Sequence, residues 1–191
     1  EAIIVAGFAG LVAGSLSMAL GEYLSVQSSR ELLANQLVLE ARELEESPDA
    51  EVAELREIYE RKGVPPHLAS ELAEHMVRSD PRLALDTMAR EELGFDPDEL
   101  GGSAWVAAGT SLMLFAAGAL VPVLPFLFAG SEVALIGAAV LSAIALFGLG
   151  AGITSLTGTN PVRSGARQLA FGATAAAITY GIGLLVGSAL R

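Results

Sequence analysis

Two pairs of glutamates, each spaced by three residues, are the first candidates for chemistry in this sequence. Glu40 and Glu43 form one pair, and Glu51 and Glu54 form the other. Residues i and i+3 of a helix project from the same side and can share a ligand. An unbroken helix would hold all four carboxylates within about 80° of arc, because the pairs are separated by close to three turns. Pro48 lies between the pairs and is expected to bend such a helix.

Met88 and Glu91 repeat the three-residue spacing, with Glu92 alongside. Carboxylates this close repel one another, and they stay ionised only beside a cation or become neutral by taking up protons. Oxygen ligands alone suit Ca²⁺ or Mg²⁺, whereas a thioether moves the preference toward first-row transition metals. The spacing is compatible with a divalent-metal site. It is equally compatible with a solvated acidic helix face, which is the more common meaning of such a pattern.

Other kinds of reactive centre find little support. The chain has no cysteine, which excludes disulfides, thiolate metal sites and thiol catalysis. It has two histidines, His67 and His75. Glu71 and His75 stand at i, i+4 and could share a metal, but we expect both to be surface residues of a packed helix. No Ser-His-Asp set, phosphate loop or nucleotide fingerprint is present, and we expect no enzymatic activity and no organic cofactor.

The charges are concentrated in one part of the chain. The 191 residues have a mean hydropathy of +0.54 and a net charge of −11. Residues 22–100 contain 20 of the 22 acidic and 8 of the 11 basic residues, giving this block a net −12. The composition excludes an ordinary soluble enzyme. It also argues against nucleic-acid binding, which needs clustered Lys and Arg.

The remaining sequence predicts membrane spans. Four stretches carry no charged residue, and each is at least as long as the ~20 residues that a helix needs to cross a bilayer. We therefore predict an all-α polytopic membrane protein with spans at 2–21, 104–128, 133–154 and 167–189. Pro122 and Pro125 must kink or break the second span. Arg163 and Arg167 flank the last loop, and positive charge prefers the cytoplasmic side, so we expect the acidic block to be cytoplasmic.

The sequence of the acidic block itself predicts a series of helices. Residues 22–46 continue the first span, and Ser47 and Pro48 begin a second helix that ends near Gly63. Two more helices are predicted at 65–79 and 80–94, the last capped by Asp80. The domain boundaries follow as a first span at 1–24, a helical metal-binding domain at 25–100, and three spans at 101–191.

The first span carries a narrow stripe at i, i+4, i+8 and i+12, formed by Gly10, Gly14, Met18 and Glu22. Small residues allow membrane helices to approach closely. An ionisable residue in a span is costly and favours a functional reading. Met18 as simple filler and Glu22 as an interface marker remain the alternative.

Several segments resemble the vacuolar iron transporter family. AGFAGLVAG and SMALGEYLSVQS (6–14 and 17–28) resemble its second span, and GALVPVLPF (118–126) resembles its third. NPVRSGARQL and TYGIG (160–169 and 179–183) resemble its last loop and fifth span. The resemblance covers essentially the whole chain. It implies a further span before Glu1. In the family, this additional span bears an aspartate.

The resemblance also implies a function. Family members form homodimers and exchange cytosolic Fe²⁺, and often Mn²⁺, for protons. Carried over by position, the metal ligands are Glu40, Glu43, Glu51, Glu54, Met88 and Glu91, and the translocation path includes Met18 and Glu22. A second Met of the family is replaced here by Thr87, which weakens the soft contribution. We thus expect an iron/proton antiporter in a bacterial or archaeal cell membrane, with metal ions, protons, lipid and a second copy as its partners.

Two other functions stay open from the residues. The chain could be a membrane-anchored metal buffer that binds ions without moving them, which the absent span favours. It could also be a membrane scaffold whose acidic block docks a basic partner.

Overall fold

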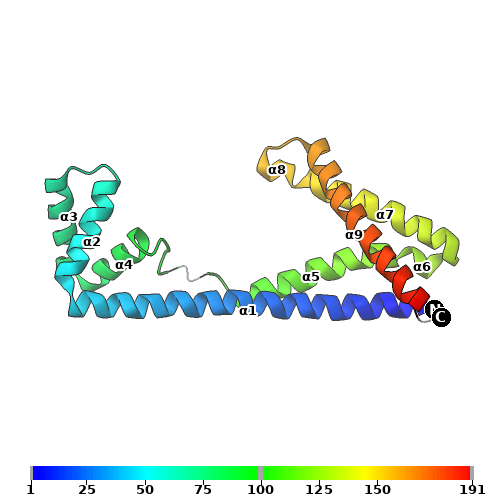
Figure 1. Cartoon of the computed structure of the whole chain (residues 1–191), viewed down its shortest axis with the longest axis horizontal. Coiled ribbons are helices and arrows are strands. Elements are labelled where there is room, and N and C mark those ends of the chain that lie inside the picture. Colours follow the sequence, from blue (N-terminus) through cyan, green and yellow to red (C-terminus); the bar gives the residue numbers. More distant parts are fainter. Residues whose placement is uncertain (1, 99–100, 190–191) are drawn as a thin grey trace. The chain divides into compact units, whose positions relative to one another are not determined.

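The computed structural model describes residues 2–98 and 101–189, and within these ranges every regular element is a helix (Figure 1). The ends of the predicted domain ranges at 1, 100 and 191 lie outside the described residues. The chain divides into two compact units, one formed by Ser17–Leu112 and the other by Glu1–Leu16 together with Met113–Arg191. Each unit is described by itself below.

The prediction of four spans is confirmed. The long apolar helices are α1 (Ala2–Glu46), α5 (Ala104–Val123), α7 (Ser131–Gly152) and α9 (Pro161–Ala189), and each is long and apolar enough to cross a membrane. At most 17% of the residues in their most apolar windows are buried within the chain. Apolar surface of this extent requires cover by lipid or by other helices.

Proline shapes the second predicted span. Pro122 is accommodated inside α5, and the helix ends at Val123, before a separate short helix α6 (Pro125–Phe128) begins. Proline lacks the amide hydrogen that continues a helix, so the predicted break occurs between these two prolines. In the third span, α7 gives way to a second short helix, α8 (Thr154–Thr157).

The helix of the last span begins earlier than predicted, at Pro161 rather than near residue 167. Asn160 Oδ1 accepts hydrogen bonds from the amides of Val162 and Arg163 at 3.0 and 3.1 Å. Pro161 occupies the first helical position, where its fixed φ suits the helix. Arg163 and Arg167 therefore lie within the first turns of α9, next to the loop that they were predicted to flank.

Helices α7 and α9 pack against each other within their unit, and glycines allow the two helices to approach closely. A Cβ on Gly150 would lie 2.7 Å from the carbonyl oxygen of Ser164 and 2.9 Å from Cα of Gly165. A Cβ on Gly172 would lie 2.3 Å from a methyl carbon of Leu146. The expectation that small residues serve close helix packing holds for this pair.

Gly150→Ala should therefore destabilise the α7–α9 pair by about 1–3 kcal/mol, since the obstructing atoms of Ser164 and Gly165 are backbone and cannot rotate away. Gly148→Ala is the matched control, because no atom lies within 4 Å of the Cβ it would add. Thermal unfolding of the full chain in one detergent measures both. Equal melting temperatures for the two variants would contradict the close approach.

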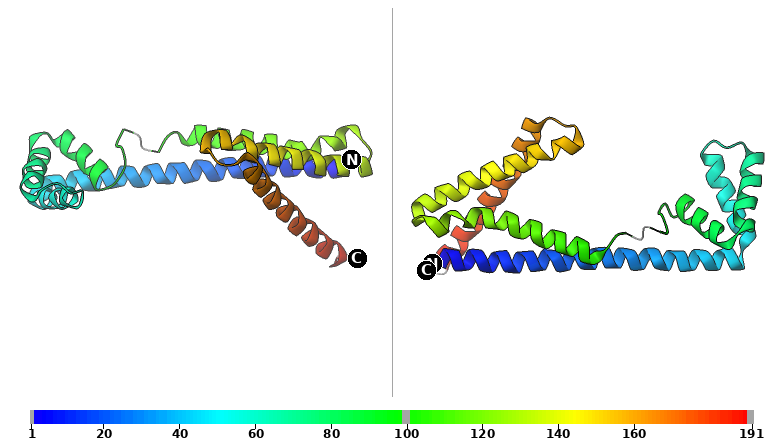
Figure 2. Two further views of the ribbon diagram at one scale, coloured as in Figure 1. Left: turned by 90° about the horizontal axis from the view of Figure 1, so that it is seen from above. Right: turned by 180° about the vertical axis from the view of Figure 1, so that it is seen from behind.

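The second unit contains the acidic block. The first span continues without interruption into the polar part of α1, as predicted, and three helices follow: α2 (Pro48–Arg61), α3 (Pro66–Ser79) and α4 (Pro81–Glu91). Helices α2 and α3 lie side by side as an antiparallel pair, and α4 packs against α3 (Figure 2). Their turns follow the sequence signals: Gly63 has φ of +90°, and Asp80 Oδ1 accepts a hydrogen bond from the Arg82 amide at 2.8 Å.

A small apolar core holds these three helices together. Its members share near-complete burial: Leu55, Tyr59, Ala69, Ala73, Val77 and Met88. Leu44 of α1 packs against this core, so the polar end of α1 belongs to the same packed structure. Near the predicted membrane surface, the rings of Tyr23 and Trp105 lie 4.8 Å apart, and Arg30 donates a hydrogen bond to the Gly102 carbonyl. These contacts join α1 to the chain that leads into α5.

Candidate metal centre

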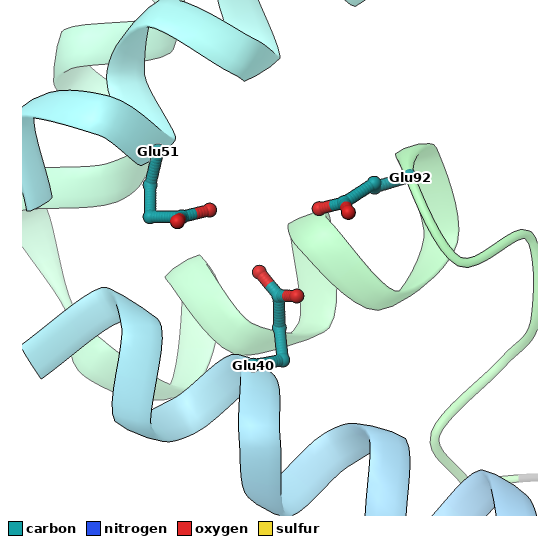
Figure 3. A group of neighbouring side chains, drawn as sticks. All are labelled: Glu40, Glu51 and Glu92. Carbon is teal, nitrogen blue, oxygen red and sulfur yellow. The ribbon is translucent and has the colours of Figure 1, made fainter. Parts of the chain in front are cut away.

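Three carboxylates from three different helices converge in the second unit. Glu40 projects from α1, Glu51 from the first turn of α2, and Glu92 from the C-cap position directly after α4 (Figure 3). One oxygen atom from each lies within 4.8 Å of the other two. The three side chains point toward one another, as ligands around a single cation would.

Local sequence explains two of these positions. Pro48 restarts the helix, so Glu51 lies in the first turn of α2, where the helix dipole favours a carboxylate. Glu92 closes α4: its amide donates to the Met88 carbonyl at 2.9 Å, and Gly94 then leaves the helix with φ of +75°. The C-terminal end of a helix disfavours negative charge. A bound cation would therefore stabilise the charged form of Glu92 more than that of a carboxylate at the start of a helix.

The burial of this cluster is its most unusual property. Glu40 is only 3% exposed and Glu51 only 6% exposed, although Glu92 remains accessible. Among the described residues, Glu40 Oε1 is buried and has no hydrogen-bond partner. A buried carboxylate without a partner is costly, and such groups in proteins are paired, protonated or bound to a metal.

The cluster shifts the acidity of its members in one direction. Burial, reinforced by repulsion from Glu92 and Glu51, raises the pKa of Glu40 to about 7. Burial also raises the pKa of Glu51 and of Glu92, with further repulsion from neighbouring glutamates. The metal-free centre therefore holds protons near neutral pH that a divalent cation would have to displace.

Comparison with known proteins identifies the relatives of this chain. Residues 1–184 match the model of the VIT family. The chain is 33% identical over 187 residues to vacuolar iron transporter 1 of Tulipa gesneriana, spanning 97% of this chain and 75% of the relative. The chain belongs to the VIT family. It is also 32% identical over 180 residues to vacuolar iron transporter 1 of Arabidopsis thaliana, spanning 93% of this chain and 71% of that one. A vacuolar iron transporter of Acanthamoeba castellanii is 33% identical over 184 residues, with shares of 96% and 69%.

In this VIT-family chain, the structure brings only part of the predicted ligand set to the cluster. Glu40 and Glu51 are members. Glu43 and Glu54 are exposed but close enough for their charge to raise the pKa of Glu40. Met88 is fully buried in the apolar core of the domain. Its role as a ligand stays a prediction from the resemblance.

The resemblance implied Glu91 as a ligand, but in the structure the neighbouring Glu92 is the residue that joins the cluster. Glu91 forms an ion pair with Lys62, and Glu92 is the third member of the cluster. The sequence contained a signal for Glu92, because residues three and four positions after Met88 both lie on its side of a helix. Periodicity alone does not choose between these two neighbours.

The remaining candidates lie elsewhere in the VIT-family chain. Met18 is 50% exposed on α1, and Glu22 is exposed one turn later. Their place in a path stays a prediction. Glu71 and His75 are exposed on α3, and His67 is exposed at its start, consistent with the expectation that these are surface residues.

Proposed function

We propose that this chain is a divalent-metal transporter that carries cytosolic Fe²⁺, and Mn²⁺ with it, across a membrane in exchange for protons. Membership of the VIT family and the four candidate spans support transport of a metal ion. The observation that carries the proposal is the buried carboxylate of Glu40, which has one oxygen, Oε1, without a hydrogen-bond partner and faces Glu51 and Glu92.

The donor set supports a hard or borderline divalent cation as the substrate. Carboxylate oxygens suit Mg²⁺, Ca²⁺ and Mn²⁺, and they also accept Fe²⁺. The preference for iron draws on the names of the relatives, which are vacuolar iron transporters. We propose Glu40, Glu51 and Glu92 as the central ligands, with Glu43 and Glu54 supplying negative potential at the entrance. Met88 and Glu91 remain ligand candidates by resemblance.

Proton coupling follows from the chemistry of these oxygens. Metal binding requires the deprotonated carboxylates, so a metal ion and protons compete for the same atoms. A pKa near 7 for Glu40 places this competition in the physiological range. Binding of a cation releases protons, and proton uptake favours release of the cation. No covalent bond is made or broken, so the proposed activity is transport and not catalysis.

The proposed route runs from the centre to Met18 and Glu22 on α1. Both side chains are exposed on a helix that is otherwise apolar over its first turns, so a second copy of the chain could contribute the opposite wall. We propose a homodimer in a bacterial or archaeal cell membrane, surrounded by lipid, with the helices α2–α4 in the cytoplasm. The positions of Arg163 and Arg167 at the start of α9 support this orientation.

Met18→Ala and Glu22→Ala should each lower Fe²⁺ uptake at least fivefold in proteoliposomes that carry a pH gradient, because each removes a candidate ligand from the path. The natural full-length protein is used. Leu20→Ala is the control, since Leu20 is exposed on the same helix and offers no ligand atom.

Unchanged uptake in both variants would reject this path. Metal binding without any flux in the full-length protein would favour a membrane-anchored buffer. No binding at micromolar metal would favour an acidic scaffold that docks a basic partner.

A further inference from the structure

An ion pair joins the C-terminal ends of α2 and α4. Lys62 caps the C-terminal end of α2, and its Nζ contacts the carboxylate of Glu91, the last residue of α4. The two side chains are 53% and 27% exposed, so the contact lies at the edge of the domain. Glu91 immediately precedes Glu92, the ligand that α4 contributes to the cluster.

Glu92 needs such a restraint more than Glu40 or Glu51 does. Glu40 and Glu51 are buried, whereas Glu92 is accessible and lies where the helix ends. Repulsion from the neighbouring carboxylates disfavours the inward position of Glu92, and burial followed by this repulsion raises its pKa. Helix α4 packs mainly on α3, with sparse direct contact to α2. Met88, one turn earlier, is fully buried and packs α4 into the apolar core.

We propose that Lys62 is a positioning residue for metal binding: by holding Glu91, it keeps the end of α4 against α2 and so keeps Glu92 opposite Glu51. This inference rests on the proposed metal centre. A ligand held in its bound geometry before the metal arrives binds with less loss of conformational entropy. The pair therefore raises metal affinity although neither Lys62 nor the contact itself touches the metal.

The sign of the effect separates this proposal from its main rival. If Lys62 acted only through its positive charge, its removal would tighten metal binding, because the site would become more negative. The same tightening is expected if Glu91 is itself a ligand from which the metal must displace Lys62. A positioning role instead predicts weaker binding once Lys62 is neutral.

Lys62→Met in the full chain should weaken Mn²⁺ binding about threefold, the range that a partly exposed ion pair can supply. Free Mn²⁺ is measured by electron paramagnetic resonance during a titration in detergent. Arg61→Met is the matched control, since it removes an exposed positive charge from the neighbouring residue and leaves Lys62 and Glu91 in place. Its affinity should stay within twofold of the unaltered protein.

Three further variants test the mechanism. Lys62→Arg keeps a cation that can reach Glu91 and should retain the affinity. Glu91→Gln should weaken binding as much as Lys62→Met, and the double variant should lose no more than either single one, because both remove the same contact.

Hydrogen exchange supplies a direct readout of position. The amides of Glu92 and Phe95 donate to carbonyls of α4 at 2.9 and 3.1 Å, and both bonds lie at the end that Lys62 holds. In metal-free Lys62→Met these amides should exchange about threefold faster, while the amides of α3 should keep their protection. Arg61→Met should show neither change.

Unchanged or tighter Mn²⁺ binding in Lys62→Met would overturn the positioning role, as would equal losses in Lys62→Met and Lys62→Arg. If the unaltered chain binds Mn²⁺ and Glu40→Gln abolishes binding, the metal centre stands whatever the result for Lys62. If the unaltered chain binds no Mn²⁺, the metal centre and this inference fall together.

Discussion

Glu40→Gln should lower the affinity of the chain for Mn²⁺ or Fe²⁺ about 100-fold, at the upper end of what single changes around a metal site cost. Glutamine keeps the size of the side chain but removes a negative charge and leaves an amide in its place. Glu40 is the most deeply buried member of the cluster, so solvent cannot replace the lost ligand. Isothermal titration of the full-length protein in detergent at pH 7.5 measures the change.

The control for Glu40→Gln is Glu31→Gln, which removes the same charge from α1. Glu31 is exposed and lies nine residues away, half a turn around the helix from Glu40. Its affinity should match that of the unaltered protein. Comparable losses in both variants would show that net charge and not the cluster attracts the metal, which would remove the main support for the proposed centre.

Without metal, the acidic domain should lose stability as the pH rises from about 5 to 8. The folded-state pKa of Glu40 is raised from 4.5 to about 7 by burial and then by repulsion. A carboxyl group with a raised folded-state pKa stabilises the fold while protonated, and that contribution is lost as the pH rises through the folded-state pKa. The free energy of unfolding should fall by roughly 1–3 kcal/mol, and the raised pKa values of Glu51 and Glu92 act with the same sign.

Hydrogen–deuterium exchange of the α2 and α3 amides at pH 5 and pH 8, corrected for intrinsic rates, reports this free energy. Glu40→Gln should remove most of the pH dependence and make the metal-free domain more stable than the unaltered one at pH 8. Mn²⁺ at 100 times its dissociation constant should restore about 2.7 kcal/mol to the unaltered protein. A pH-independent exchange pattern would mean that Glu40 is not held in the buried position described.

These two predictions describe a conflict between metal affinity and the stability of the metal-free domain. The centre that would bind metal is an arrangement of like charges of which Glu40 and Glu51 are buried, so the metal-free domain is less stable than its apolar core would allow. The same arrangement would make the binding energy of a cation large. Glu40→Gln should therefore improve the stability of the metal-free domain and lose the metal affinity, a pattern that a purely structural carboxylate would not show.

The sequence by itself determined the elements with good accuracy. The four spans follow from uncharged runs at least as long as a bilayer requires, and the helix breaks follow from Pro48, Gly63 and Asp80. Both kinds of signal are local, because hydropathy and capping depend on residues within a few positions of one another. The early start of α9 was missed, although Asn160 and Pro161 together form a start signal of the same local kind.

The composition of the cluster was decided only by the tertiary structure. The sequence placed Glu40, Glu43, Glu51 and Glu54 on helix faces, and its family resemblance favoured Glu91 over the neighbouring Glu92 as a ligand. Which carboxylates meet depends on how α1, α2 and α4 are rotated about their axes, and that rotation is fixed by the burial of Leu44, Leu55 and Met88 in a shared core. A rotation of about 100° separates Glu91 from Glu92, enough to send one to Lys62 and the other to Glu40.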